Sequence, residues 1–254
     1  MGGCRLLVMR QLMPTLCRLC QLPNELRKSH IIPEFLYRPG YDEKGRLKEL
    51  VVSTGRKKYL QKGFRERLLC DGCEDTIGKY EKYFADFWYQ TDPIPDPVVD
   101  DALSLSIRYP EFKLFLLSIL WRSSISTLEP FEAVALGPFE DEVRRMLLDG
   151  SPGPDTRFQI FGVVYLTPST RKPCHDVIMP PRRARGPRGT IAYQFIFGAV
   201  GWFFLVSNRT DSSIKSGALS CDGRMAFPVE DLVSDAPLTK MFVDHQLNAR
   251  ARAK

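Results

Sequence analysis

The chain has 254 residues, 44% of them hydrophobic, which is an ordinary globular composition and enough for one large or two modest domains. Its 36 Lys and Arg against 30 Asp and Glu give a net charge of +6, which permits a polyanionic partner without requiring one. Seven cysteines, four of them in Cys-x-x-Cys pairs, disfavour a disulfide framework and favour metal binding in a reducing compartment. The first residues contain no apolar stretch of signal-peptide length, so we expect an unexported, cytoplasmic protein.

Two cysteine pairs are the first feature along the chain. Cys17 and Cys20 form one pair, and Cys70 and Cys73 form the other. Each pair offers two sulfurs from one tight turn, and two such turns complete the tetrahedron that zinc prefers. The second pair opens a segment, 73–88, whose apolar residues recur at helical spacing. We therefore predict a structural zinc ion held by a loop and by the start of a helix.

A histidine lies between the two pairs, in the segment Ser29-His30-Ile31-Ile32-Pro33. The proline disfavours helix just before it, so we expect His30 in an extended segment or at the start of a strand. The imidazole is a candidate for chemistry, for a hydrogen bond to a backbone carbonyl, or for a zinc ligand. The zinc reading is the weakest, because four cysteines already fill the coordination sphere.

The segment 47–53 has the pattern of a strand, and the basic segment 57–69 leads into a second strand. Such a stretch can neutralise phosphates without reading bases, although a solvated charged hairpin would look the same. The candidate nucleic-acid contacts are Arg56, Lys57, Lys58, Lys62, Arg65 and Arg67.

A Pro-rich stretch, 91–97, separates two predicted domains, 1–90 and 91–254. In the second domain the pattern predicts a buried helix over 110–126, a shorter helix over 140–148, and strands over 157–166 and 176–179. An arginine cluster at 182–185 falls in a loop flanked by Pro and Gly, where it could add a nucleic-acid contact.

The most apolar run, 190–206, is slightly short for a membrane helix and contains Gln194 and glycines. We predict two paired strands there, with a turn near Gly198 or Gly201, and no membrane partner. The fold class is therefore α+β: an N-terminal zinc treble clef of the ββα-metal type, followed by a region with a buried helix and a mainly antiparallel sheet. Oligomerisation, target choice or protein-partner binding is the expected role of that second region.

The order Cys17-x-x-Cys20, Ser29-His30-Ile-Ile-Pro33, Leu69-Cys70-x-x-Cys73-Glu74 resembles the zinc-bearing HNH (His-Me finger) nucleases, over residues 15–88. The resemblance implies that His30 is the general base for an attacking water and that the cysteines hold a structural zinc. It also implies a catalytic Mg²⁺ or Mn²⁺, a nucleic-acid substrate with DNA as the first choice, and a setting in phage defence or a mobile element.

The chain departs from the family pattern at two places. Ser29 stands where the family usually has a metal-binding carboxylate or histidine, and Glu74 stands where it has Asn or His. Glu74 then either lies near a divalent ion in a remodelled site or only stabilises the helix N-terminus. Glu81, two turns further on, shares its helix face, and we expect it to be solvated.

Two other classes of function stay open. One is a catalytically inactive zinc module that binds nucleic acid or a protein. The other is an assembly protein whose second region forms a homo-oligomer.

Overall fold

A computed structural model of the chain describes residues 15–51, 56–61, 63–94, 102–186, 189–208 and 217–232. The side chains of 47–51 and 56–61 are outside this description, as is Lys62. The fold is mixed α+β with a mainly antiparallel sheet, as predicted. Within the described part of the chain, no helix is long and apolar enough to cross a membrane.

The N-terminal part is organised around two strands that are far apart in sequence. Strands β1 (Arg27–His30) and β4 (Arg65–Leu69) pair antiparallel, and His30 is opposite Arg65. His30 therefore ends a strand, where the sequence suggested an extended segment or a strand start. The chain between them forms helix α1 (Glu34–Tyr37), the 3-10 turn η1 (Arg38–Gly40), and a second antiparallel pair of β2 (Arg46–Val51) with β3 (Arg56–Gln61).

Strand β4 runs directly into the long helix α2 (Asp71–Gln90), with Cys70 at the junction. Acidic Asp71 and Glu74 occupy the first turn, where the positive end of the helix dipole favours them. A cysteine turn, the antiparallel pair of β1 with β4, and helix α2 come together in the N-terminal part of this mixed α+β fold.

The second part begins with the edge strand β5 (Ala102–Ser106) and helix α3 (Tyr109–Ile125). The turns η2 (Glu129–Phe131) and η3 (Gly137–Phe139) lead to helix α4 (Glu140–Asp149). The remaining strands are β6 (Ile160–Leu166), β7 (Met179–Arg185), β8 (Ile191–Phe197), β9 (Val200–Val206) and β10 (Arg224–Asp231). They form a six-stranded sheet with β5, in the order β5-β10-β6-β9-β8-β7, in which only β10 and β6 run parallel.

A two-residue turn joins β8 to β9, at one of the two predicted positions. Gly198 and Ala199 both have positive φ, +61° and +66°, the geometry that matches the twist of paired strands. The carbonyl of Gly198 accepts a hydrogen bond of 2.9 Å from Trp88 Nε1 on α2. The turn therefore also anchors the long N-terminal helix to the sheet.

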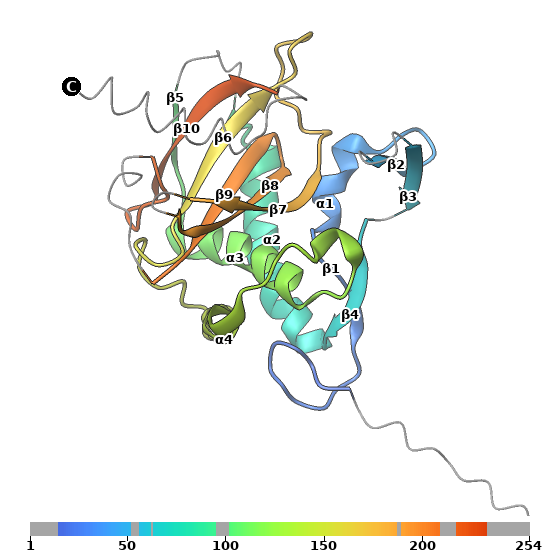
Figure 1. Cartoon of the computed structure of the whole chain (residues 1–254), viewed down its shortest axis with the longest axis vertical. Coiled ribbons are helices and arrows are strands. Elements are labelled where there is room, and N and C mark those ends of the chain that lie inside the picture. Colours follow the sequence, from blue (N-terminus) through green and yellow to red (C-terminus); the bar gives the residue numbers. More distant parts are fainter. Residues whose placement is uncertain are drawn as a thin grey trace, which may run out of the picture.

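Helices α2 and α3 cover one face of the sheet, and one hydrophobic core runs through both parts of the chain (Figure 1). The rings of Phe84 on α2 and Phe115 on α3 are 4.0 Å apart, and those of Trp88 on α2 and Trp202 on β9 are 5.7 Å apart. The proposed boundary after residue 90 coincides with the end of α2. The helix itself, however, also packs against the second part through Phe84 and Trp88.

Three expectations for the second part were wrong in detail. The strand predicted at 176–179 begins only at Met179, and the arginine cluster at 182–185 lies within strand β7 instead of in a loop. Strands β5 and β10 were not predicted. The first is only five residues long, and the second contains Pro228, a residue that argues against a strand unless the sheet leaves its nitrogen unpaired.

Candidate metal centre and histidine site

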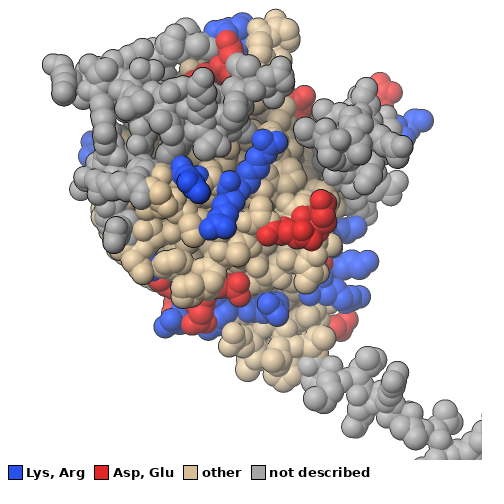
Figure 2. Space-filling view, viewed as in Figure 1, with Lys and Arg blue, Asp and Glu red and all other residues tan. Residues whose placement is uncertain are grey.

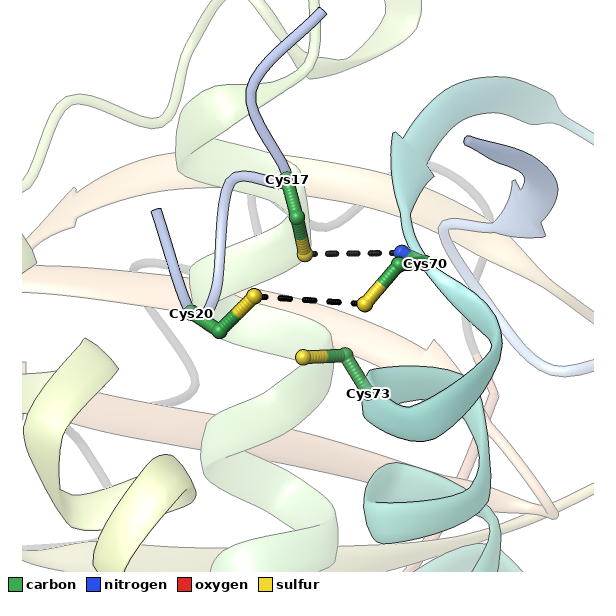
Figure 3. Close-up of side chains that lie close together, drawn as sticks. All are labelled: Cys17, Cys20, Cys70 and Cys73. Atoms are coloured by element: carbon green, nitrogen blue, oxygen red, sulfur yellow. Dashed lines mark hydrogen bonds between the residues drawn. The ribbon is translucent and has the colours of Figure 1, made fainter. Parts of the chain in front are cut away.

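The structure brings the four paired cysteines together at one end of α2 (Figure 3). Their sulfurs, on Cys17, Cys20, Cys70 and Cys73, all lie within 4.8 Å of one another. Sulfurs bound to zinc at about 2.3 Å in a tetrahedron lie about 3.8 Å apart. The sulfurs of Cys20 and Cys70 are 3.9 Å apart, and the four residues are positioned to bind a metal ion.

Local backbone geometry shapes the first cysteine turn. The amide of Cys17 donates to the carbonyl of Leu22 at 2.9 Å, and the amide of Gln21 donates to the carbonyl of Cys17 at 2.8 Å. Gln21 adopts a φ of +60° to close the turn. Across the cluster, the amide of Cys70 donates to the sulfur of Cys17 at 3.4 Å, the kind of contact that stabilises a thiolate.

The thiols differ in acidity. Burial alone would raise the pKa of Cys17, but backbone N–H groups of Cys20, Cys70 and Leu19 lower it to about 7. Burial, together with the neighbouring thiols, raises the pKa of both Cys70 and Cys73 above the usual value. A bound dication would deprotonate all four, since thiolates are the metal-binding form.

The second cluster surrounds His30. Its Nε2 lies 2.9 Å from Oε2 of Glu34, one helical turn away on α1, and Tyr41 donates to the other carboxylate oxygen at 2.8 Å. Burial first, and then the bond to Glu34, raises the pKa of Tyr41, so its hydroxyl stays protonated and remains a donor. The His30 side chain is 26% exposed, which keeps the imidazole within reach of solvent and of a ligand.

Glu74 has a different partner. The hydroxyl of the buried Ser29 donates to Oε1 of Glu74 and accepts the amide of Leu69 at 3.2 Å. Ser29 and His30 are consecutive in β1, and consecutive strand side chains point to opposite faces. Glu74 therefore approaches the Ser29 side of the strand, while His30 pairs with Glu34 on the other side.

Cationic side chains accompany His30 on its face of the strand pair. Lys28 lies two residues before His30, and the residues opposite these two are Arg67 and Arg65. Lys28, Arg65 and Arg67 are all exposed, and Figure 2 shows blue side chains along the side of the molecule where β1 and β4 lie. We call Lys28, Arg65 and Arg67 the cationic face. A second blue stripe lies over β7, where Arg182, Arg183 and Arg185 are exposed (Figure 2).

The other predicted nucleic-acid contacts cannot be placed. Arg56, Lys57 and Lys58 are in β3, but their side chains are outside the description, as is Lys62. Glu81, expected to be solvated, instead pairs at 2.8 Å with Arg122, a buried residue of α3.

Sequence reasoning missed Glu34, Tyr41 and Arg122. For Glu34 the signal was its four-residue spacing from His30 with the helix start between them. For Arg122 the signal was a charged residue in a helix that is otherwise apolar on nearly every side. Nothing in the local pattern points to Tyr41, because its contact depends on how η1 turns the chain.

Comparison of the chain with protein-family models, with curated proteins and with solved structures finds no match. The fold and the site themselves therefore carry the functional argument.

Proposed function

We propose that the chain is an HNH-like, metal-dependent endonuclease that hydrolyses phosphodiester bonds in nucleic acid, with zinc as the structural ion at the four cysteines. The observation that carries the proposal is the His30–Glu34 pair at 2.9 Å, on the strand face that also bears Lys28 and Arg65. A basic imidazole among phosphate-binding cations is the combination that hydrolysis of a phosphodiester requires.

In the proposed reaction, the imidazole of His30 accepts a proton from water as the water oxygen bonds to phosphorus and the bond to the leaving oxygen breaks. The carboxylate of Glu34, 2.9 Å from Nε2, would stabilise the imidazolium that forms when the ring takes the proton. The hydroxyl of Tyr41 holds Glu34 in turn. The cationic face would bind the phosphates on either side of the reacting one.

The sequence pattern assigns the divalent ion, Mg²⁺ or Mn²⁺, to Glu74, and the position of Glu74 on the Ser29 face of β1, opposite the His30 face, counts against that role. The Glu74 carboxylate is nevertheless partly exposed and supplies the oxygen ligand that such ions prefer, while Ser29 uses its hydroxyl in two hydrogen bonds. The ion, when bound, stabilises charge on the leaving oxygen. Glu81 is a weaker candidate because its carboxylate pairs with Arg122.

Cleavage assays test the proposal directly. Purified protein is incubated with supercoiled plasmid, single-stranded DNA or RNA, and Mg²⁺ or Mn²⁺. Loss of a general base costs about 100-fold or more in rate, so His30→Ala should abolish most cleavage. His175→Ala is the matched control, since His175 is partly buried in the β6–β7 loop and has no part in the proposed reaction. Equal cleavage by wild type and His30→Ala would exclude the assignment.

The rival proposal is a catalytically inactive zinc module that binds nucleic acid or a protein. The Ser29–Glu74 hydrogen bond favours it, because it gives Glu74 a structural task at the start of α2. This rival predicts salt-sensitive binding without cleavage, unaffected by His30→Ala and weakened by Arg56→Ala or Lys57→Ala. Sedimentation at two concentrations tests the further alternative of a homo-oligomer assembled through the second part of the chain.

We also propose a cytoplasmic location, in which the thiols stay reduced for metal binding. A setting in phage defence or a mobile element follows only from the resemblance to HNH nucleases.

A further inference from the structure

Helix α3 contains a buried arginine, Arg122, among side chains that are mostly apolar. The helix is buried along nearly its whole length, and the side chain of Arg122 is 1% exposed. A charge in such surroundings is costly unless paired charges and hydrogen bonds offset its desolvation. The partners of Arg122 therefore indicate why this position carries a charge.

The guanidinium of Arg122 joins three elements. Its Nη1 donates to the main-chain carbonyl of His30 at 2.7 Å and lies 2.8 Å from Oε1 of Glu81 on α2. Its Nη2 and Nε donate to the hydroxyl and carbonyl of Ser118, one turn earlier on α3, at 3.1 and 3.2 Å. The end of β1 is thus tied to both long helices through one side chain.

We propose that Arg122 is a positioning residue for His30: by holding the His30 carbonyl it sets where the imidazole stands relative to the bound phosphate. The inference rests on the proposed nuclease function. His30 is the last residue of β1, and its carbonyl belongs to the same peptide group as the Ile31 amide, which donates to the Phe64 carbonyl at 3.0 Å. Arg122 therefore holds the carbonyl side of a peptide group whose amide side is held by the segment that leads into β4. Glu34 holds the imidazole of His30, and Arg122 holds the main-chain carbonyl of the same residue.

The same argument gives the second part of the chain a role in catalysis. Arg122 lies beyond the predicted boundary at residue 90, yet its contact is with the proposed catalytic residue of the first part. A misplacement of about 1 Å at a reacting group can cost about 100-fold in rate. The region that the sequence presents as scaffold would thereby set the geometry of the site.

The replacement Arg122→Met separates positioning from stability. Buried ion pairs can often be replaced by apolar side chains of similar volume with little or no loss of stability. In the variant, Glu81 is partly exposed and can be solvated. Arg157→Met is the control, because Arg157, with 20% of its side chain exposed, binds one carboxylate, Glu142, one main-chain carbonyl, Ser207, and the side chain of Asn208, all away from His30.

The experiment measures kcat and KM for nucleic-acid cleavage, zinc content and urea unfolding for the full-length wild type, Arg122→Met, Arg122→Lys and Arg157→Met. We expect kcat of Arg122→Met to fall by about 10-fold or more at nearly unchanged KM and zinc content. Arg122→Lys should recover part of the loss, and Arg157→Met should keep wild-type kcat. A folded, zinc-loaded Arg122→Met with wild-type kcat would overturn the proposal.

A second measurement keeps the inference testable apart from activity. The chain has only three histidines, so selective labelling of histidine gives few ring signals, and His30→Ala assigns the one from His30. We expect the ring signals of His30 to move in Arg122→Met or Arg122→Lys and to stay in Arg157→Met. Unchanged His30 signals would overturn the positioning role. A wild type that cleaves nothing while those signals move would reject only the nuclease function.

Discussion

The imidazole of His30 and the carboxylate of Glu34 lie 2.9 Å apart, joined across one turn of chain in which Pro33 precedes the first residue of α1. The hydroxyl of Tyr41 donates a hydrogen bond of 2.8 Å to the other carboxylate oxygen of Glu34. The histidine thus has an anionic partner that is itself held in place. This arrangement is the usual way in which a protein orients a basic imidazole.

We predict that Glu34→Gln lowers the cleavage rate about 10- to 100-fold, as the loss of a carboxylate that orients a functional histidine usually does. The amide keeps the shape of the side chain but loses its charge. Glu111→Gln is the matched control, because the Glu34 and Glu111 side chains are 32% and 33% exposed and each pairs with a basic group on its neighbouring turn. Equal rates for the two variants would remove Glu34 from the proposed site.

The cysteine cluster predicts one tightly bound zinc ion per chain. Cys20→Ser should lose that ion and destabilise the N-terminal part, because binding of a structural zinc ion contributes directly to folding. Cys221→Ser should keep it, since Cys221 is exposed and is not part of the cluster. Metal analysis of the purified proteins, and thermal unfolding with and without a chelator, check both statements. Full zinc content in Cys20→Ser would contradict the assignment.

The cationic face predicts a specific dependence on salt. Arg65→Ala should weaken binding to nucleic acid and reduce the slope of log affinity against log salt by about one, since each lost phosphate contact releases about one counterion fewer. Arg224→Ala is the control, because Arg224 is also exposed but belongs to β10 and pairs with Asp222. Fluorescence anisotropy with a labelled oligonucleotide at several salt concentrations measures the slopes. Identical slopes for both variants would exclude Arg65 from the interface.

The aromatic contacts of α2 predict that the two parts of the chain unfold together. Trp88 packs against Trp202 and donates to the Gly198 carbonyl at 2.9 Å, so Trp88→Ala should cost about 3 to 5 kcal/mol. Zinc release and loss of sheet signal should then occur in one transition, at a lower urea concentration than in the wild type. Two separate transitions in the wild type would indicate independent domains, divided as the Pro-rich stretch suggests.

Local patterns predicted the elements with a strong apolar signal. Helices α2 and α4 come from helical spacing of apolar residues, helix α3 and the pair of β8 and β9 come from nearly continuous apolar runs, and the cysteine spacing anticipated the cluster. The missing strands, β5 and β10, do alternate, but β5 is only five residues long and β10 contains Pro228, which argues against a strand. Both depend on pairing with their neighbours in the sheet. Tertiary pairing overrides local preference at such positions.

The site also contains residues that the sequence pattern reveals and residues that it does not. His30 and the four cysteines stand in motifs that a reader of the sequence can recognise. Arg122 contacts His30 across 92 positions of chain, and no pattern in either segment reveals that distance in space. The four-residue spacing of His30 and Glu34 is visible in the sequence. It predicts a contact only if a helix begins between the two residues, which the sequence did not establish.

The buried Lys113 of α3 gives a prediction for pH. Its Nζ donates to the carbonyls of Pro154 and Arg157 at 2.7 and 2.6 Å, and burial lowers its pKa from 10.5 to about 7. Between these two values the unfolded chain binds more protons than the folded one, so this residue makes the folded state more stable as pH rises from 7 toward 10. That stability is lost as pH falls from 10.5 toward 7, and below the folded pKa both states bind the proton, so no further change follows.

Urea unfolding of the wild type and Lys113→Met at pH 7, 8 and 9 checks the sign. The difference in free energy of unfolding, wild type minus variant, should increase by up to about 1.4 kcal/mol for each pH unit as pH rises in this window. Taking the difference removes the tyrosines and cysteines that both proteins share. For Lys79→Met, at an exposed position on α2, the free energy of unfolding should depend on pH as it does in the wild type. If the free energy of unfolding of Lys113→Met has the same pH dependence as that of the wild type, Lys113 stays protonated when buried, held by the carbonyls that surround it.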